Sequence, residues 1–461
     1  MTVSGLSCGT SYYFVVESET DPHTYNQNTV VSELSSEVSG SPALALYPPS
    51  PLPAGTQGQP YTVVITASGG TGPYTYTVSG GALPSGMTLS TDGTLSGTPA
   101  VRGQFSFVVS ATDTSSCGGS LPYALSITPA TDAIAGEGPD SSNTNRVRVY
   151  DASGVPTPVD FQAYSAGSWG TRICSGAIDG VGVWEIVTGP GPGAVFGPHV
   201  RAFSAIGLPI SKVSFFAYAT LKFGVNPGAG LLDGDVFDEI VSGAGPGAVF
   251  GPQVRGWNYD GIAVAPIPGV NYFAYATLRF GVTVGDGNVD GDAFDELLTG
   301  PGPGSSFGPQ VRGWDYDGVA LSAMTKINFL PPYTPAAYGV NVAGGDVDGD
   351  GFGEIATAPG PGASLPARFL GFDYDGVAIA PLPGFDVTPM TTVYGARLGL
   401  ASLEGGSQED LMAGAGPDPT ADSMVSAYVY TGSSLAPLAG SFLPFGTEKY
   451  GVNVAGGILG L

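Results

Sequence analysis

Charge is scarce in this sequence, and basic residues are scarcer than acidic ones. Only 11% of the 461 residues are charged, and 14 Lys and Arg oppose 39 Asp and Glu, for a net charge of −25. Because contacts to phosphate require Lys and Arg, a nucleic-acid partner is not expected. No run approaches the ~20 apolar residues of a transmembrane helix, so no membrane span is expected either.

Histidine and cysteine are also rare. The two histidines, His23 and His199, lie in different parts of the chain, so no Ser-His-Asp triad or histidine metal centre is expected. The cysteines Cys8, Cys117 and Cys174 are far apart and contain no CxxC pair. One disulfide can form, but the sequence does not select its pair. We therefore predict that the protein is not an enzyme, and a propeller hydrolase or lyase is the least favoured alternative.

Glycine and proline are abundant instead, with 74 and 40 residues. They are the two poorest helix formers, so a helical protein is not expected. A hydrophobic content of 42% argues against disorder, and the absence of a three-residue glycine period excludes collagen. The composition predicts a large all-β protein of more than one domain. The many Thr, Ser, Asn and Gly residues fit an extracellular or cell-surface protein, although no signal peptide is visible after Met1.

Residues 1–44 contain alternating strands and the segment GLSCGTSYYFVVESE, followed by VVSELSSEVSGSPA. This region resembles the C-terminal half of a fibronectin type III domain whose first strands are absent. An incomplete sandwich leaves an open sheet edge, so we expect either that the chain is a fragment or that another molecule or domain completes this module, for example by self-assembly. The alternative is a short independent hairpin. Residues 45–53 are predicted to be a stiff Pro-rich linker.

Residues 54–130 contain ASGGTGPYTYTV, LPSGMTLS and GTLSGTP. This combination resembles the bacterial putative-Ig (cadherin-like) repeat, which implies a β-sandwich spacer without catalytic residues.

Residues 131–461 repeat with a period of about 55 residues, and each unit contains four predicted strands. Such a period indicates the blades of a β-propeller. The last strand, YGVNVAGGILGL, repeats the first strand of an inner unit and is expected to pair with the strand at Asp132. The predicted fold is therefore two β-sandwich modules, the first incomplete, followed by a six-bladed propeller closed by the C-terminal strand. A ring of seven blades is the alternative if the chain is a fragment.

Three loops in this region carry carboxylates at alternating positions, with a glutamate at the ninth. Side-chain oxygens without His or Cys favour a hard cation such as Ca²⁺. The first loop is the most complete, the second has Ala293 where a glycine is expected, and the third has Leu231 at its first position. The candidate ligands are Asp346, Asp348, Asp350 and Glu354 in the first loop, Asn288, Asp290, Asp292 and Glu296 in the second, and Asp233, Asp235 and Glu239 in the third.

The strings DVDGDGFGEIATAPGPG and NVDGDAFDELLTGPGPG resemble FG-GAP (VCBS-type) repeats of integrin-α-like propellers. The resemblance implies Ca²⁺ in these loops, mainly for rigidity. The alternative is that the loops are solvated acidic hairpins without metal. The expected function is adhesion or recognition of a protein or glycan at the cell surface or matrix. A structural subunit of an extracellular fibre or sheath is the second possibility.

Four arginines recur at one position of these repeats, and two of them are followed by tryptophan. We expect each arginine to pair with an acidic neighbour, with an anion-binding collar as the alternative, and the tryptophans to pack between blades. The residues are Arg148, Arg201, Arg255, Arg312, Trp257 and Trp314.

Overall fold

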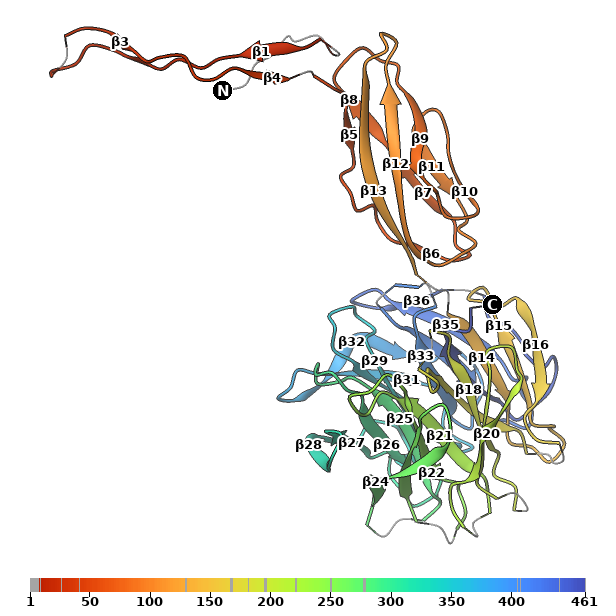
Figure 1. Ribbon diagram of the computed structural model, residues 1–461. Helices are drawn as coiled ribbons and strands as arrows, with labels where there is room; N and C mark the ends of the chain where they lie inside the picture. The colour runs from red at the N-terminus through yellow and green to blue at the C-terminus, as the bar shows by residue number, and fades with distance from the viewer. Residues whose placement is uncertain are drawn as a thin grey trace. The chain divides into compact units, whose positions relative to one another are not determined.

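The structure, a computed structural model, is entirely built from strands and turns. It describes residues 8, 10–25, 27–40, 42–128, 131–165, 169–180, 182–194, 197–219, 222–248, 251–276, 279–403, 405–406, 408–438 and 440–460. No helix occurs among these residues. The chain divides into two compact units, Met1–Pro129 and Ala130–Leu461 (Figure 1).

A hairpin arm occupies the start of the first unit. Two short antiparallel ladders form it, and they join β1 (Tyr12–Phe14) to β4 (Val38–Gly40) and β2 (Glu19–Thr20) to β3 (Val30–Val31). No further strand pairs with it within residues 10–40, so its apolar side chains remain exposed. Tyr13 is 66% exposed and Val38 is 63% exposed. Of the module predicted at residues 1–44, residues 1–7, 9, 26 and 41 lie outside the described residues.

The rest of the first unit is a sandwich of short sheets. One sheet has the order β6-β13-β12-β9, a second has the order β10-β11-β7, and β5 pairs with β8. Alternate residues of β12 (Gly103–Thr112) and β13 (Gly118–Thr128) point inward, and Phe107, Val109 and Leu125 are almost completely buried. A disulfide joins Cys8 to Cys117 and ties the chain's start to this core. The remaining strands are β6 (Gly55–Thr56), β7 (Tyr61–Val64), β9 (Thr75–Gly81), β10 (Met87–Leu89) and β11 (Thr94–Gly97).

The prediction of a free linker at residues 45–53 is wrong. β5 (Ala45–Tyr47) pairs with β8 (Thr66–Ser68), and Leu52 is buried in the core of the sandwich. The backbone N–H of Leu52 donates to Ala124 O at 2.9 Å. Pro48, Pro49, Pro51 and Pro53 follow β5 in an irregular segment, where the missing proline N–H groups cost no sheet hydrogen bonds. This segment is therefore part of the Ig-like module.

Within its described residues, the second unit contains six four-stranded antiparallel sheets. Five of them follow the chain order. These are β17 (Thr171–Gly176), β18 (Glu185–Pro190), β19 (His199–Phe203) and β20 (Pro209–Phe216); β21 (Val225–Gly230), β22 (Glu239–Ala244), β23 (Gln253–Tyr259) and β24 (Val264–Phe273); β25 (Val282–Gly287), β26 (Glu296–Pro301), β27 (Val311–Tyr316) and β28 (Leu321–Phe329); β29 (Val340–Gly345), β30 (Glu354–Pro359), β31 (Phe369–Tyr374) and β32 (Ile379–Val387); and β33 (Ala396–Ala401), β34 (Asp410–Ala415), β35 (Val425–Tyr430) and β36 (Leu435–Pro437).

The sixth sheet combines both ends of this unit. β37 (Val452–Gly457) pairs with β14 (Asp132–Glu137), which continues into β15 (Arg146–Tyr150) and β16 (Pro156–Gln162). The predicted pairing of the last strand with the strand at Asp132 is confirmed. The innermost strands, called the inner strands below, are β17, β21, β25, β29, β33 and β37. Each contacts the next in this order, and β37 contacts β17 again.

An aromatic residue followed by glycine precedes every inner strand, and both residues have positive φ. At Tyr338 and Gly339 the φ values are 67° and 68°. A Cβ on Gly339 would lie 1.9 Å from Pro301 O, so no other residue fits this close backbone approach. The aromatic-glycine pair recurs visibly in the sequence, but its left-handed backbone was not predicted from it.

Candidate metal-binding loops

The three acidic loops occupy equivalent places in the second unit. Each connects an inner strand to the second strand of its sheet, and the ninth loop residue is the first residue of that second strand. The second strands β22, β26 and β30 are buried along their whole length. The glutamates are therefore fixed at the edge of the core, whereas the aspartates project from the turns.

In each loop the structure brings three carboxylates together. Their oxygens lie within 4.8 Å of one another, and the groups are Asp346, Asp348 and Glu354; Asp290, Asp292 and Glu296; and Asp233, Asp235 and Glu239. One member of each group is buried, one is half-buried and one is exposed. Three acidic oxygens at this spacing can hold one cation, and without a cation their charges repel.

The glutamates are oriented by the backbone of their own loops. The second loop residue donates its N–H to a glutamate oxygen at 2.8 Å in all three cases, as from Val347 to Glu354 Oε2. Glu239 is fully buried, and its other oxygen, Oε1, has no hydrogen-bond partner among the described residues. A buried carboxylate oxygen without a partner is costly, and a cation would satisfy it.

Burial raises the pKa of all three glutamates to about 8, with a further contribution from neighbouring aspartates. The carboxylates of Asp346 and Asp348 repel the charge on Glu354 in this way. Charging these glutamates is therefore unfavourable unless a positive ion lies beside them. The donor set, which is all oxygen and rich in carboxylates, fits Ca²⁺.

Two predicted ligands lie outside the three-carboxylate groups. Asp350 is not among the oxygens that converge in its loop, and its Oδ1 instead accepts from the N–H of Phe352 at 2.9 Å. Asn288 donates its side-chain amide to Asp292 O at 2.7 Å and accepts from Gly291 N at 2.8 Å. Both side chains brace the turns, and their role as metal ligands stays a prediction.

A chain of hydrogen bonds, which sequence reasoning missed, links these loops to one another. The residue before each ninth position donates its N–H to the first position of the preceding sheet's loop, as from Asp295 to Leu231 O at 2.7 Å and from Gly353 to Asn288 O at 2.6 Å. Asp295 also accepts through Oδ2 from the N–H of Leu231 at 2.8 Å. The acidic loops therefore form the seam between adjacent sheets.

The prediction that the recurrent arginines pair with acids is correct only for Arg148, whose Nε lies 3.0 Å from Asp160. The other three donate to backbone carbonyls, as Arg255 does to Ala217 O at 2.6 Å. These carbonyl groups lie where a sheet ends and accept the arginine N–H groups, so the arginines need no acidic partner. The tryptophans pack against aromatic rings as predicted, with centroids 4.6 Å apart for Trp257 and Phe215.

Comparisons with known proteins support part of this description. Residues 43–120 match the family described as Putative Ig domain. No curated protein matches the chain. A solved structure of a quinonprotein alcohol dehydrogenase-like protein from Bacteroides thetaiotaomicron is similar at 10% identity, over 88% of this chain and 96% of that chain, with a TM-score of 0.33. An Ig-like module is typical of proteins with an extracellular or surface role.

Within the described residues there is no helix of the length and hydrophobicity needed to cross a membrane.

Proposed function

We propose that this chain is a non-enzymatic extracellular protein of adhesion or recognition, in which Ca²⁺ stabilises a six-bladed propeller of the FG-GAP kind. The convergence of three carboxylates in each of three equivalent loops carries this proposal. The Ig-like module supports an extracellular location, where Ca²⁺ is abundant enough to fill weak oxygen-ligand sites.

The propeller is supported by the closed sequence of contacts between inner strands and by the pairing of β14 with β37. Pairing of the first and last strands of the second unit removes the exposed sheet edges that an open ring would leave. The acidic loops carry the hydrogen bonds between adjacent sheets. Calcium bound in these loops would therefore hold neighbouring blades together, and the loops of the propeller would remain free to contact a surface protein or glycan.

Calcium binding is tested by titrating CaCl₂ into the full, EGTA-treated chain in a calorimeter, and by measuring Tm with Ca²⁺ and with EGTA. We expect saturable binding and a large rise in Tm. The control is Asp375→Asn, because Asp375 is an exposed carboxylate that accepts two backbone N–H groups in a hairpin without a metal cluster. A melting curve that Ca²⁺ leaves unchanged would overturn the calcium part of the proposal.

Recognition is tested separately, by applying the full chain to glycan and matrix-protein arrays with Ca²⁺ and with EGTA. Calcium-dependent retention on a defined class of spots is expected. Absence of retention in both conditions, with a folded calcium-loaded chain, would overturn recognition while leaving calcium binding intact.

A structural subunit of a fibre or sheath is the second candidate, because the hairpin arm has open edges and exposed apolar side chains. Strand addition from a neighbouring chain would cover them. Sedimentation and electron microscopy of the full chain, against a variant lacking residues 10–40, test this candidate. Filaments that depend on the arm would favour it, and a monomer at all concentrations would exclude it.

A further inference from the structure

A pocket at the centre of the second unit is lined by one polar residue from each inner strand. In every case this is the second residue of the strand, and the set is Arg172, Asn226, Thr283, Asn341, Arg397 and Asn453. We call these six residues the polar ring. The cavity has a volume of about 80 Å³, and the next residue of each inner strand adds an apolar lining. It has room for a small ion or a few waters.

Four members of the polar ring close the seams between inner strands. Each donates a side-chain hydrogen bond to a backbone carbonyl at the start of the following inner strand, as Asn453 does to Thr171 O at 2.8 Å and Asn226 does to Val282 O at 2.6 Å. Thr283 and Asn341 make the equivalent bonds. These four residues therefore have a structural role that repeats around the ring.

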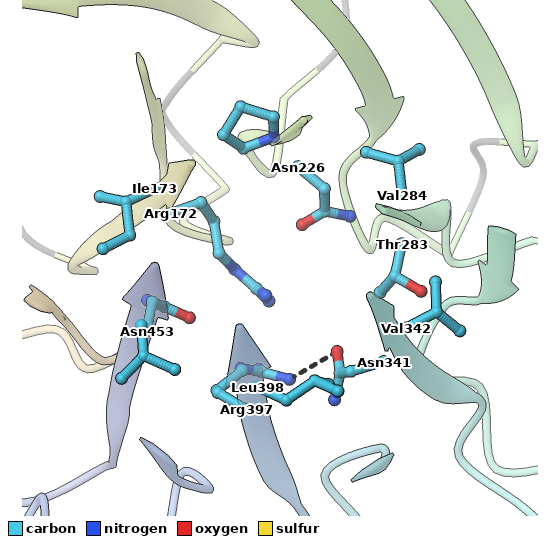
Figure 2. A pocket seen from close by; sticks show the side chains of 12 residues that line it. Arg172, Ile173, Asn226, Thr283, Val284, Asn341, Val342, Arg397, Leu398 and Asn453 are labelled. Atoms are coloured by element: carbon cyan, nitrogen blue, oxygen red, sulfur yellow. Dashed lines mark hydrogen bonds between the residues drawn. The ribbon is translucent and has the colours of Figure 1, made fainter. Parts of the chain in front are cut away.

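The two arginines depart from this pattern. Figure 2 shows Arg172 extending into the space between the strands and Arg397 turned towards Asn341, whose Oδ1 accepts from Arg397 Nη1 at 3.0 Å. Neither guanidinium forms an ion pair among the residues that the structure describes. Arg397 is only 8% exposed.

The environment of these arginines favours a bound anion. Burial lowers the pKa of Arg172 to about 10, and burial together with the nearby Arg172 lowers that of Arg397 well below its ordinary value. Asp286 lines the adjoining part of the cavity, but its carboxylate makes no ion pair with either arginine. Arg397 is buried and Arg172 is half-buried, and two like charges held together without a counter-charge destabilise a fold.

We propose that Arg172 and Arg397 bind a small oxyanion in the pocket of the polar ring. Guanidinium groups match the oxygens of sulfate, phosphate and carboxylate through paired N–H donors. Asn341 would remain the partner that orients Arg397. The site is distinct from the acidic loops, since it selects an ion of the opposite charge and is built from inner strands.

Calorimetric titration of the full chain with sodium sulfate and with sodium formate, at constant ionic strength and fixed Ca²⁺, tests this proposal. We expect saturable binding, and the stronger ligand distinguishes a tetrahedral from a planar oxyanion. Tm should rise with the logarithm of the concentration of that ligand. Arg172→Leu should weaken binding by about tenfold or more, whereas Arg279→Gln, a change at an exposed arginine, should leave it unchanged.

A second readout separates binding from general salt effects. In chloride buffer without oxyanion, Arg172→Leu should be at least as stable as the natural chain, because it removes one of two charges that repel each other. In sulfate the order should reverse. Equal responses to sulfate in the natural chain, Arg172→Leu and Arg279→Gln would overturn the proposal, because they would show only the general stabilisation that sulfate gives to folded proteins.

Discussion

The acidic loops and the polar ring both gather like charges, but they do so on different scales. In a loop, the three carboxylates lie within nine consecutive residues and repeat in three sheets. In the polar ring, Arg172 and Arg397 come from strands far apart in the chain and meet only because the inner strands contact one another in a closed sequence. The acidic loops can be recognised in the sequence because they repeat. The two arginines stand out because they replace the Asn or Thr found at the same position of the other inner strands.

The largest effect that distinguishes the two clusters is the pH dependence of the calcium-free protein. The pKa of each loop glutamate is about 8 in the folded chain and near 4.3 when unfolded. Between these values the folded chain binds more protons, so its free energy of unfolding falls as pH rises. In EGTA we expect Tm to fall by roughly 5–10 °C from pH 5 to pH 8.

Saturating Ca²⁺ supplies the positive charge that the protons otherwise provide, so it should remove most of this fall. Arg172→Leu should not change the slope, because Arg172, whose pKa is about 10, stays charged over this range. Parallel curves with and without Ca²⁺ would show that no cation binds beside the glutamates.

The next largest effect is a loss of stability from a substitution at the start of an inner strand, which leaves the acidic loops intact. Gly339→Ala places a Cβ 1.9 Å from Pro301 O at a φ of 68°. We expect a loss of about 3 kcal/mol in the free energy of unfolding, from the combined cost of a left-handed alanine and a forced backbone shift. Denaturant unfolding with Ca²⁺ present measures it.

Gly376→Ala is the matched control, because Gly376 has a φ of 78° but nothing within 4 Å of its added Cβ. It should cost about 1 kcal/mol. Equal losses in the two variants would mean that the close approach at the start of the inner strand is not limiting.

A smaller effect ranks the loops against one another. Glu354→Gln should remove the tightest calcium site, while Glu239→Gln should remove the weakest, because its loop has Leu231 at the first position. We expect each variant to lose one site in the calorimetric stoichiometry and about 1–3 kcal/mol of stability at saturating Ca²⁺. Unchanged stoichiometry in Glu354→Gln would contradict the assignment of its loop, and Asp375→Asn serves as the charge-matched control.

Sequence reasoning predicted the features that local patterns encode. The all-β class, the four-stranded repeats and the pairing at Asp132 followed from strand periodicity and from the similarity of the last strand to an inner one. The linker at 45–53 was mispredicted because its prolines, which follow β5 in an irregular segment packed on the sandwich, resemble those of a free segment. The hydrogen bonds between loops, such as that from Gly353 N to Asn288 O, join backbone atoms of adjacent sheets. Backbone atoms are common to all residue types, so no sequence pattern predicts these bonds.

The smallest effect compares an arginine that has an acidic partner with one that has none. Arg148 lies on a half-exposed part of β15, with its Nε 3.0 Å from Asp160 and its Nη1 2.7 Å from Pro444 O. Arg148→Gln should cost no more than about 1 kcal/mol, because water screens such a pair, and the cost should be the same in chloride and in sulfate. The effect of Arg172→Leu on stability should instead change sign between the two salts, since a charge without an acidic partner gains from a mobile counter-ion. Denaturant unfolding of both variants in both salts measures this contrast. A sulfate-dependent cost at Arg148, or a salt-independent one at Arg172, would show that the acidic partner does not separate the two arginines.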